Sequence, residues 1–211
     1  MAQDLDDIKL NALDVFGYNA SDPLLDATTL VRLVNSALQQ LSTEFDWPWL
    51  YGEGTITTVA GTTDYAVPTN WSRTKWLAID EDELQFRSLR DLRRIMGDTD
   101  IQRQPVFYAT VGDTSIRLGQ IPDAVYTVDH GYFKQEAVLS AGGNAPLLDS
   151  AYDDMLVMYV AKKMAMRKGE TRDINQAQRE IDSWLKRTRD NVRRSSAFPR
   201  IITRNDWSSR I

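Results

Sequence analysis

The hydrophobic period of this chain changes twice along its length. Up to about residue 50 the apolar residues recur at helical spacing, which predicts one helix that ends at Gly17 and a second that starts at Asp22-Pro23. Between residues 51 and 145 short β-rich segments alternate with turn residues. From Pro146 the helical period returns and predicts a hairpin of two helices. These changes predict an α+β fold in which a β insertion separates two helical segments.

The same changes divide the chain into three parts. Residues 1–50 and 146–194 are expected to form one helical domain, because the β insertion leaves the terminal helices as natural packing partners. Residues 51–145 are expected to form an antiparallel β-sheet or a small sandwich, in which 55–59 pairs with 64–68 as a hairpin. Residues 195–211 are expected to form an extended C-terminal arm.

The charge of the chain changes sign near its C-terminus. Residues 162–211 carry a net charge of +8, and because the whole chain sums to −5, residues 1–161 carry −13. In the arm, large apolar residues are isolated by polar ones, so the arm cannot bury them against itself. It must pack on its own domain or on another subunit. The candidate partner-contact residues are Arg187, Arg193, Arg194, Phe198, Pro199, Arg200, Ile201, Ile202, Arg204 and Trp207.

The basic stretch within this region has three interpretations. Lys186-Arg187-Thr188-Arg189, with Arg193-Arg194, could meet a protein surface of opposite charge, form a plain solvated helix face, or contact DNA directly. Asp182 and Asp190 interrupt the cations, which argues against a DNA groove and favours a charged protein interface.

Most catalytic and metal chemistry is excluded by residues that the sequence lacks. Without cysteine the chain has no disulfide, no thiolate nucleophile and no cysteine-bound zinc, which fits a reducing cytosol. A single histidine rules out a multi-histidine metal site and leaves one candidate base for a serine triad. No phosphate-binding loop, dinucleotide-binding motif or nucleophile elbow is present. We therefore expect no enzyme, no cofactor and no metal, and no apolar stretch long enough for a membrane span.

Three further features have both a structural and a chemical interpretation. Strand alternation places His130 with Val128 and Tyr132, which favours a packed or interface histidine. Asp80–Glu83 could bind Ca²⁺ or Mg²⁺, but it lacks the glycine and spaced ligands of a calcium loop, so a solvated turn is the better interpretation. Trp47-Pro48-Trp49 is interpreted as an aromatic plug between helical and β layers rather than a platform for stacking bases.

The order of these features resembles the head-to-tail adaptor (connector) proteins of tailed bacteriophages. That group includes the tail tubular A proteins and the tail accessory factors of short-tailed phages. The resemblance spans nearly the whole chain and rests on loose motifs. They are Phe45-Asp46-Trp47-Pro48-Trp49, Asp64-Tyr65-Ala66-Val67-Pro68, Trp71-Ser72-Arg73, Pro105-Val106-Phe107-Tyr108, Ile116-Arg117-Leu118 with Ile121-Pro122, Tyr132-Phe133, and Pro146-Leu147-Leu148-Asp149.

The resemblance implies a structural protein of the virion neck, made in the host cytoplasm, with no catalytic residue or cofactor. It implies a ring of neighbouring adaptor subunits, usually twelve, beneath the portal protein. The C-terminal segment would dock on the portal, and the β region would face the next tail or nozzle protein. Genomic DNA would pass through the lumen without specific binding, because an acidic channel repels its phosphates.

Three other functions stay open at the level of sequence. The basic helix within residues 162–194 could belong to a DNA-binding packaging or regulatory protein, whose binding would depend on salt. Asp80–Glu83 could belong to a metal-assisted hydrolase. Another phage structural part, such as a tail completion or neck protein, would have a similar architecture.

Overall fold

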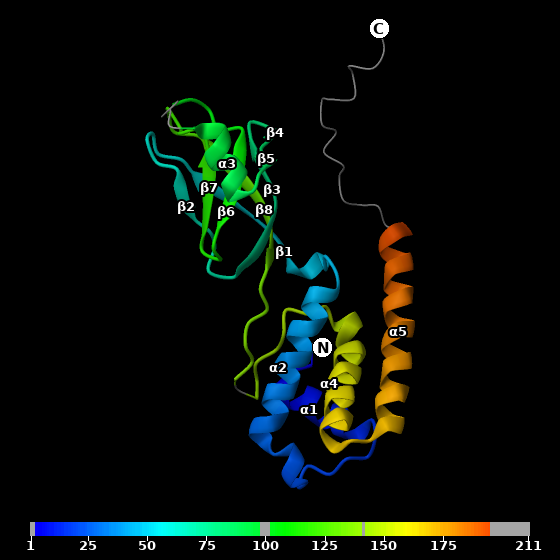
Figure 1. Cartoon of the computed structure of the whole chain (residues 1–211). Helices are drawn as coiled ribbons and strands as arrows, with labels where there is room; N and C mark the ends of the chain where they lie inside the picture. Colours follow the sequence, from blue (N-terminus) through cyan, green and yellow to red (C-terminus); the bar gives the residue numbers. More distant parts are fainter. Residues whose placement is uncertain (1–2, 98–101, 141, 195–211) are drawn as a thin grey trace. The chain divides into compact units, whose positions relative to one another are not determined.

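The computed structural model describes residues 3–97, 102–140 and 142–194 (Figure 1). The described residues form five α-helices and two four-stranded β-sheets, which confirms the predicted α+β class. The chain divides into two compact units. One contains the described residues up to Leu50 and from Glu136 onwards, and the other contains those from Tyr51 to Gln135. The chain therefore crosses between the two units twice.

The first unit is helical, and α4 is its central element. The helices are α1 (Leu5–Asp14), α2 (Ala27–Glu44), α4 (Asp153–Lys168) and α5 (Thr171–Arg194), with short 3-10 turns at Pro23–Leu25, Pro48–Leu50 and Ser150–Tyr152. α4 packs against α1, α2 and α5. Its apolar buried residues are Met155, Leu156, Val157, Tyr159, Val160, Ala161, Met164 and Ala165. A helix that is apolar on most sides has to be covered by several neighbours, which α4 obtains from both ends of the chain.

α2 begins later than the sequence predicted. It starts at Ala27, where the carboxylate of Asp26 accepts a 2.7 Å hydrogen bond from the backbone N–H of Thr29. Asp22-Pro23 instead starts the preceding 3-10 turn, and Asp22 pairs with Lys168 near the end of α4. The predicted start was wrong because two aspartates four residues apart both cap a turn, and only the second one caps the helix.

The tryptophan motif after α2 belongs to the core of the helical unit. Trp47 is 1% exposed, and its Nε1 donates a 2.6 Å hydrogen bond to the carbonyl of Leu41. Its ring stacks on Trp49 with centroids 4.4 Å apart and meets Tyr152 edge-on at 5.4 Å. An indole buried in this way offers no free face for a nucleic-acid base.

The side chain of Asn35 fastens the returning chain to α2. Asn35 Oδ1 accepts a 2.8 Å hydrogen bond from the N–H of Leu139, and Asn35 Nδ2 donates a 2.9 Å bond to the carbonyl of the same residue. The side-chain amide therefore satisfies both backbone groups, as a neighbouring strand would. Leu139 itself is buried, so the chain that leaves the β unit is fixed to the helical unit at this point.

The second unit is a sandwich of two sheets, with strand orders β1-β8-β3-β4 and β2-β7-β6-β5. The strands are β1 (Tyr51–Thr57), β2 (Asp64–Ala66), β3 (Trp71–Ile79), β4 (Asp82–Glu83), β5 (Gln85–Phe86), β6 (Phe107–Val111), β7 (Ser115–Gly119) and β8 (Thr127–Lys134), and the unit also holds α3 (Leu89–Met96). Neighbouring strands are antiparallel except β5 and β6, which are parallel. Side chains of both sheets form the core: Tyr65, Leu77, Ile79, Leu84, Tyr108, Ile116, Leu118 and Val128.

The predicted hairpin between residues 55–59 and 64–68 is wrong. β1 pairs with β8 in one sheet, and β2 pairs with β7 in the other. The hydroxyl of Thr58, just after β1, donates to the carbonyl of Ala124 and accepts from the N–H of Tyr126 at 2.7 Å. These bonds keep the chain beside the start of β8 before it crosses to the second sheet. β6 and β7, in contrast, are neighbours in the chain and pair as an antiparallel hairpin across Gly112-Asp113.

His130 lies in the core of the β unit, as strand alternation predicted. It is 1% exposed, and its Nε2 lies 3.0 Å from the hydroxyl of Thr74. Burial lowers the pKa of His130 to about 4, so the ring is neutral at physiological pH.

We predict that His130 makes the stability of the protein depend on pH. The pKa of His130 in the folded protein lies below the ordinary value of about 6.5. The free energy of unfolding is therefore not reduced by His130 above pH 6.5, and it falls as the pH drops from 6.5 toward 4, because the unfolded chain then binds the proton more tightly. Between pH 7 and 5 this loss amounts to about 2 kcal/mol. Urea unfolding at both pH values should show a smaller loss in His130→Gln, which can still bond to Thr74 but does not titrate. Equal losses in the two proteins would contradict the prediction.

A second prediction concerns Gly131 in β8. A Cβ atom at this position would lie 2.3 Å from Nε1 of Trp76, and that nitrogen donates a 3.2 Å hydrogen bond to the hydroxyl of Tyr51. The indole cannot move aside without losing this bond. Gly131→Ala should therefore lower the free energy of unfolding by about 1–3 kcal/mol. The matched control is Gly54→Ala, where the nearest atom to the new Cβ is Tyr132 Cε1 at 3.8 Å, an ordinary contact.

Candidate interaction surface

α5 packs against α4 and lies along one side of the helical unit (Figure 1). Ala177, Ile181 and Thr188 are buried, while Ile174 and Leu185 are half-buried, so one stripe at helical spacing covers α4. The other sides of α5 carry exposed polar and charged residues, which makes this helix the main candidate for contact with a partner.

The first turn of α5 is anchored to the connection between α1 and α2. Gly169, with a φ of 78°, ends α4 in the left-handed conformation. The hydroxyl of Tyr18 then donates a 2.7 Å hydrogen bond to Asp173 of α5, and Arg167 Nε donates a 2.6 Å bond to the carbonyl of Leu24. Burial and the bond to Asp173 raise the pKa of Tyr18, so its hydroxyl stays protonated and continues to donate.

Arg187, the first predicted contact residue, is exposed on α5. Its guanidinium carbon lies 4.7 Å from the centre of the Trp184 ring, and its Nη2 donates a 3.3 Å hydrogen bond to the hydroxyl of Ser183. The stacking holds the side chain along the helix and leaves its charge at the surface. Arg187 therefore presents an ordered cation to a partner.

The remaining predicted contact residues lie at or beyond the end of α5. α5 has 24 residues and α4 has 16, so the last turns of α5 extend past the first residue of α4 (Figure 1). Arg193 and Arg194 belong to the final turn of α5. The predicted contacts Phe198, Pro199, Arg200, Ile201, Ile202, Arg204 and Trp207 lie outside the described residues.

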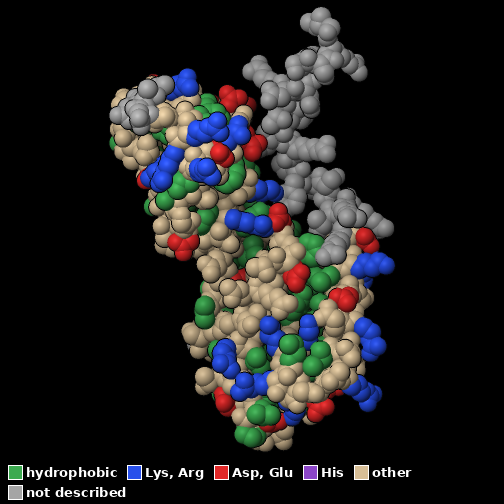
Figure 2. All heavy atoms as spheres, in the orientation of Figure 1, with side chains coloured by type: hydrophobic (Ala, Val, Ile, Leu, Met, Phe, Trp, Pro, Cys, Tyr) green, Lys and Arg blue, Asp and Glu red, His purple; other side chains and the backbone are tan. Residues whose placement is uncertain are grey.

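A second basic feature of α5 was missed by the sequence prediction. Arg172, Arg179 and Lys186 recur every seven residues and are exposed, and Lys and Arg side chains are visible along the outer edge of α5 (Figure 2). In the described part of the chain, none of the three forms an ion pair. Their seven-residue spacing was visible in the sequence. The α5 stripe is defined as Arg172, Asn175, Gln176, Arg179, Ser183 and Lys186, all of which are exposed.

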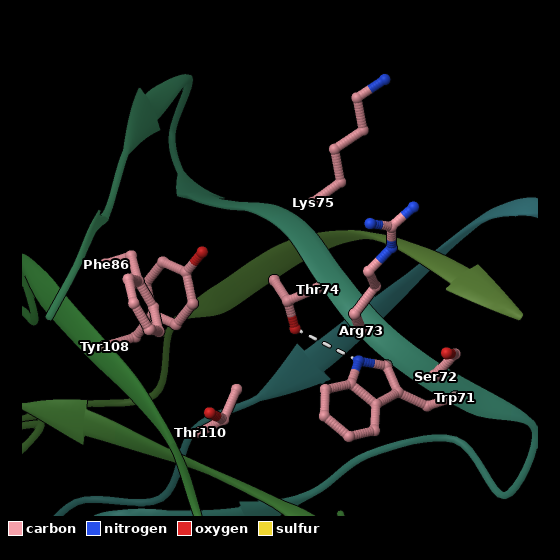
Figure 3. Close-up of a pocket in the computed structure, with 8 residues that line it drawn as sticks. All are labelled: Trp71, Ser72, Arg73, Thr74, Lys75, Phe86, Tyr108 and Thr110. Atoms are coloured by element: carbon pink, nitrogen blue, oxygen red, sulfur yellow. Dashed lines mark hydrogen bonds between the residues drawn. The ribbon is translucent and has the colours of Figure 1, made fainter. Parts of the chain in front are cut away.

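The β unit has an open groove of about 500 Å³ between its two sheets (Figure 3). It is lined by Trp71, Ser72, Arg73, Thr74 and Lys75 of β3 and by Phe86, Tyr108 and Thr110 of β5 and β6. Trp71 Nε1 donates to the Thr74 hydroxyl at 3.2 Å, and the Arg73 guanidinium stacks on Phe133 at 4.6 Å. The lining contains no carboxylate and no histidine. Its aromatic, cationic and hydroxyl groups suit contact with a partner.

The acidic run Asp80–Glu83 forms a tight turn between β3 and β4. Asp80 and Glu81 have φ values of 50° and 74°, and Ile79 pairs with Asp82 across the turn. All four acidic side chains are exposed. Among the residues that the structure describes, no group of three or more His, Cys, Asp and Glu side chains could hold a metal ion. The described helices also include none long and apolar enough to cross a membrane.

Comparison with known protein families identifies the family of this chain. The model of the SU10 adaptor protein family matches residues 3–204, which is nearly the whole chain. The chain belongs to the SU10 adaptor protein family. The resemblance to phage head-to-tail adaptors is thereby confirmed, and the adaptor is a structural component of a phage virion. A comparison with curated proteins gives no match.

The exposed cations of α5 suit an adaptor, which has to bind other proteins. Arg187 and the α5 stripe offer cations on a helix whose first turn is fixed to the body of the unit. The family match continues past α5 to residue 204, so it includes most of the predicted contact residues of the arm.

Proposed function

We propose that this adaptor is a ring subunit of the phage neck that docks beneath the portal protein by its C-terminal arm. The observation that carries the proposal is the family match, which runs through α5 and includes residues 195–204. The proposed contact residues are Arg187, Arg193, Arg194, Phe198, Pro199, Arg200, Ile201, Ile202, Arg204 and Trp207.

The form of α5 supports this role. Its first turn is tied to the body of the helical unit by the bond between Tyr18 and Asp173, whereas its last turns extend past α4. A helix held in this way can present the arm at a fixed position. The isolated apolar residues of the arm, such as Phe198 and Trp207, gain burial only when they meet another surface.

A ring gives this contact its strength and leaves the DNA free to move. We propose a ring of about twelve copies, so that each weak arm contact is repeated around the portal and the affinities multiply. Residues 1–161 carry a net charge of −13, which would repel the phosphates of DNA that passes through the lumen. The β unit would carry the next tail or nozzle protein. The adaptor needs no catalytic residue and no cofactor for these tasks.

Removal of residues 195–211 should separate folding from portal binding. The truncated protein is expected to keep its circular dichroism spectrum and melting temperature, because the packing described above involves residues before 195. It should fail to co-sediment with purified portal rings. Within the full chain, Phe198→Ala with Trp207→Ala should weaken binding, while the control Ser208→Ala with Ser209→Ala should not.

Two results would contradict the proposed function. Truncated protein that still saturates the portal would show that the arm is not the docking segment. Retention of the full chain on duplex DNA that falls steeply with salt, together with no portal binding, would favour the DNA-binding alternative based on the basic C-terminal helix.

A further inference from the structure

We infer that the α5 stripe of one adaptor copy binds the exposed face of α1 in a second copy. This inference rests on the proposed function, since it names the surfaces by which neighbouring subunits of the ring would meet. It concerns a part of α5 that lies before Arg187 and the arm.

The α5 stripe is a basic surface without acidic residues. Arg172, Arg179 and Lys186 lie on it at intervals of seven residues, or about 10.5 Å along the helix axis. The residues of the stripe that lie between these cations are neutral and exposed. No described carboxylate pairs with the three cations, although Glu180 and Asp182 lie on the same helix. These charges are therefore available to a partner.

The exposed face of α1 has the complementary pattern. The α1 face is defined as Asp7, Leu10, Asn11 and Asp14, which share one side of the helix at spacings of three and four residues. All four are exposed, and Leu10 is 59% exposed. The only lysine of α1 is Lys9, which pairs with Asp6. The α1 face thus carries two carboxylates and an exposed leucine but no cation.

The two patterns match in length. Asp7 and Asp14 are seven residues apart, as are Arg172 and Arg179, and Arg179 and Lys186. Two carboxylates can therefore meet two successive cations when the helices lie side by side in either direction. Arg179 is the middle cation, so it takes part in every such register. Leu10 then lies opposite the neutral part of the stripe, where its exposed side chain can be covered.

The positions of these helices suit a contact between copies. α1 and α5 both pack against α4, and neither relies on the other for its packing. One copy therefore presents both halves of a complementary pair, and the halves lie on different helices. Such a contact is heterologous, and it closes into a ring when the rotation between copies allows it.

A second copy fits the stripe better than DNA does. Phosphates would require cations to continue along the groove, but Asp190 lies on the line of the α5 stripe one turn after Lys186. A patch that ends after three cations fits a short acidic helix face. Every copy of the protein carries such a face on α1.

The first experiment exchanges the charges. Arg172→Glu with Arg179→Glu and Lys186→Glu should reduce the number of adaptor copies bound per portal by about tenfold at low salt. Adding Asp7→Arg and Asp14→Arg to the same chain should restore ring assembly, because the complementarity is then reversed rather than lost. The control Arg32→Glu changes the charge of an exposed residue on α2 and should assemble normally. Melting temperatures of all variants show whether they fold.

The second experiment uses the absence of native cysteine. A single-cysteine protein, Arg179→Cys, is mixed on portal rings with either Asp7→Cys or Asp14→Cys and oxidised gently. Depending on the register, one of these two partners should give a mixed disulfide dimer in excess over either homodimer, and Ser36→Cys on α2 should not replace it.

The outcomes separate this inference from the proposed function. Full rings from the Arg172, Arg179 and Lys186 variant, with portal binding intact, would overturn the inference and leave the proposed function standing. Loss of assembly that the α1 exchange does not restore would also overturn it, and would assign the stripe to an acidic portal surface instead. Failure of the unmodified chain to bind the portal would overturn the proposed function first.

Discussion

The burial of α4 is the constraint on which the rest of the structure depends. Its apolar side chains cover most of its circumference, and burial of each large one contributes about 1.5–3 kcal/mol. That stabilisation requires α1, α2 and α5 together, so the two ends of the chain must meet. The β unit is consequently an insertion between segments that are partners in one core. The order of elements along the chain follows from this requirement.

Covering α4 uses one side of each neighbouring helix and leaves the other sides to the solvent. On α5 one of these sides carries the cations of the α5 stripe, and on α1 one side carries the carboxylates of the α1 face. In the proposed function, the adaptor would assemble on a portal rather than aggregate beforehand. Weak, charge-based contacts that become strong only when repeated are suited to that order of events, because a single exposed ion pair contributes only about 0.2–1 kcal/mol.

The sequence predicted helices better than strand pairings, for physical reasons. Helix ends depend on nearby residues, and a glycine in the sequence ends both α3, at Gly97, and α4, at Gly169. Strand partners depend on distant residues, so nothing near β1 indicated that it pairs with β8. The hydroxyl of Thr58, which bonds to residues more than sixty positions away, directs the chain there. A local pattern contains no information about such a bond.

The sequence pointed to only part of the candidate surface on α5. Its density of charge singled out Arg187 and the basic end of the helix as proposed contacts, but Arg172 and Arg179 are spread too thinly to raise that density. They belong with Lys186 only because the seven-residue spacing places all three on the same side of the helix. The start of α2 was misplaced because the sequence offers two N-cap aspartates, Asp22 and Asp26. In the structure Asp22 pairs with Lys168, and Asp26 caps α2.

The clamp between Asn35 and Leu139 has a mechanical consequence. Two connecting segments join the β unit to the helical unit. The second segment is fastened to the middle of α2 by the two hydrogen bonds between Asn35 and Leu139. Tension applied to the β unit along that connection therefore reaches α2 directly at Leu139. Such a fastening would let tension on the β unit pass into α2 without loosening the helical core.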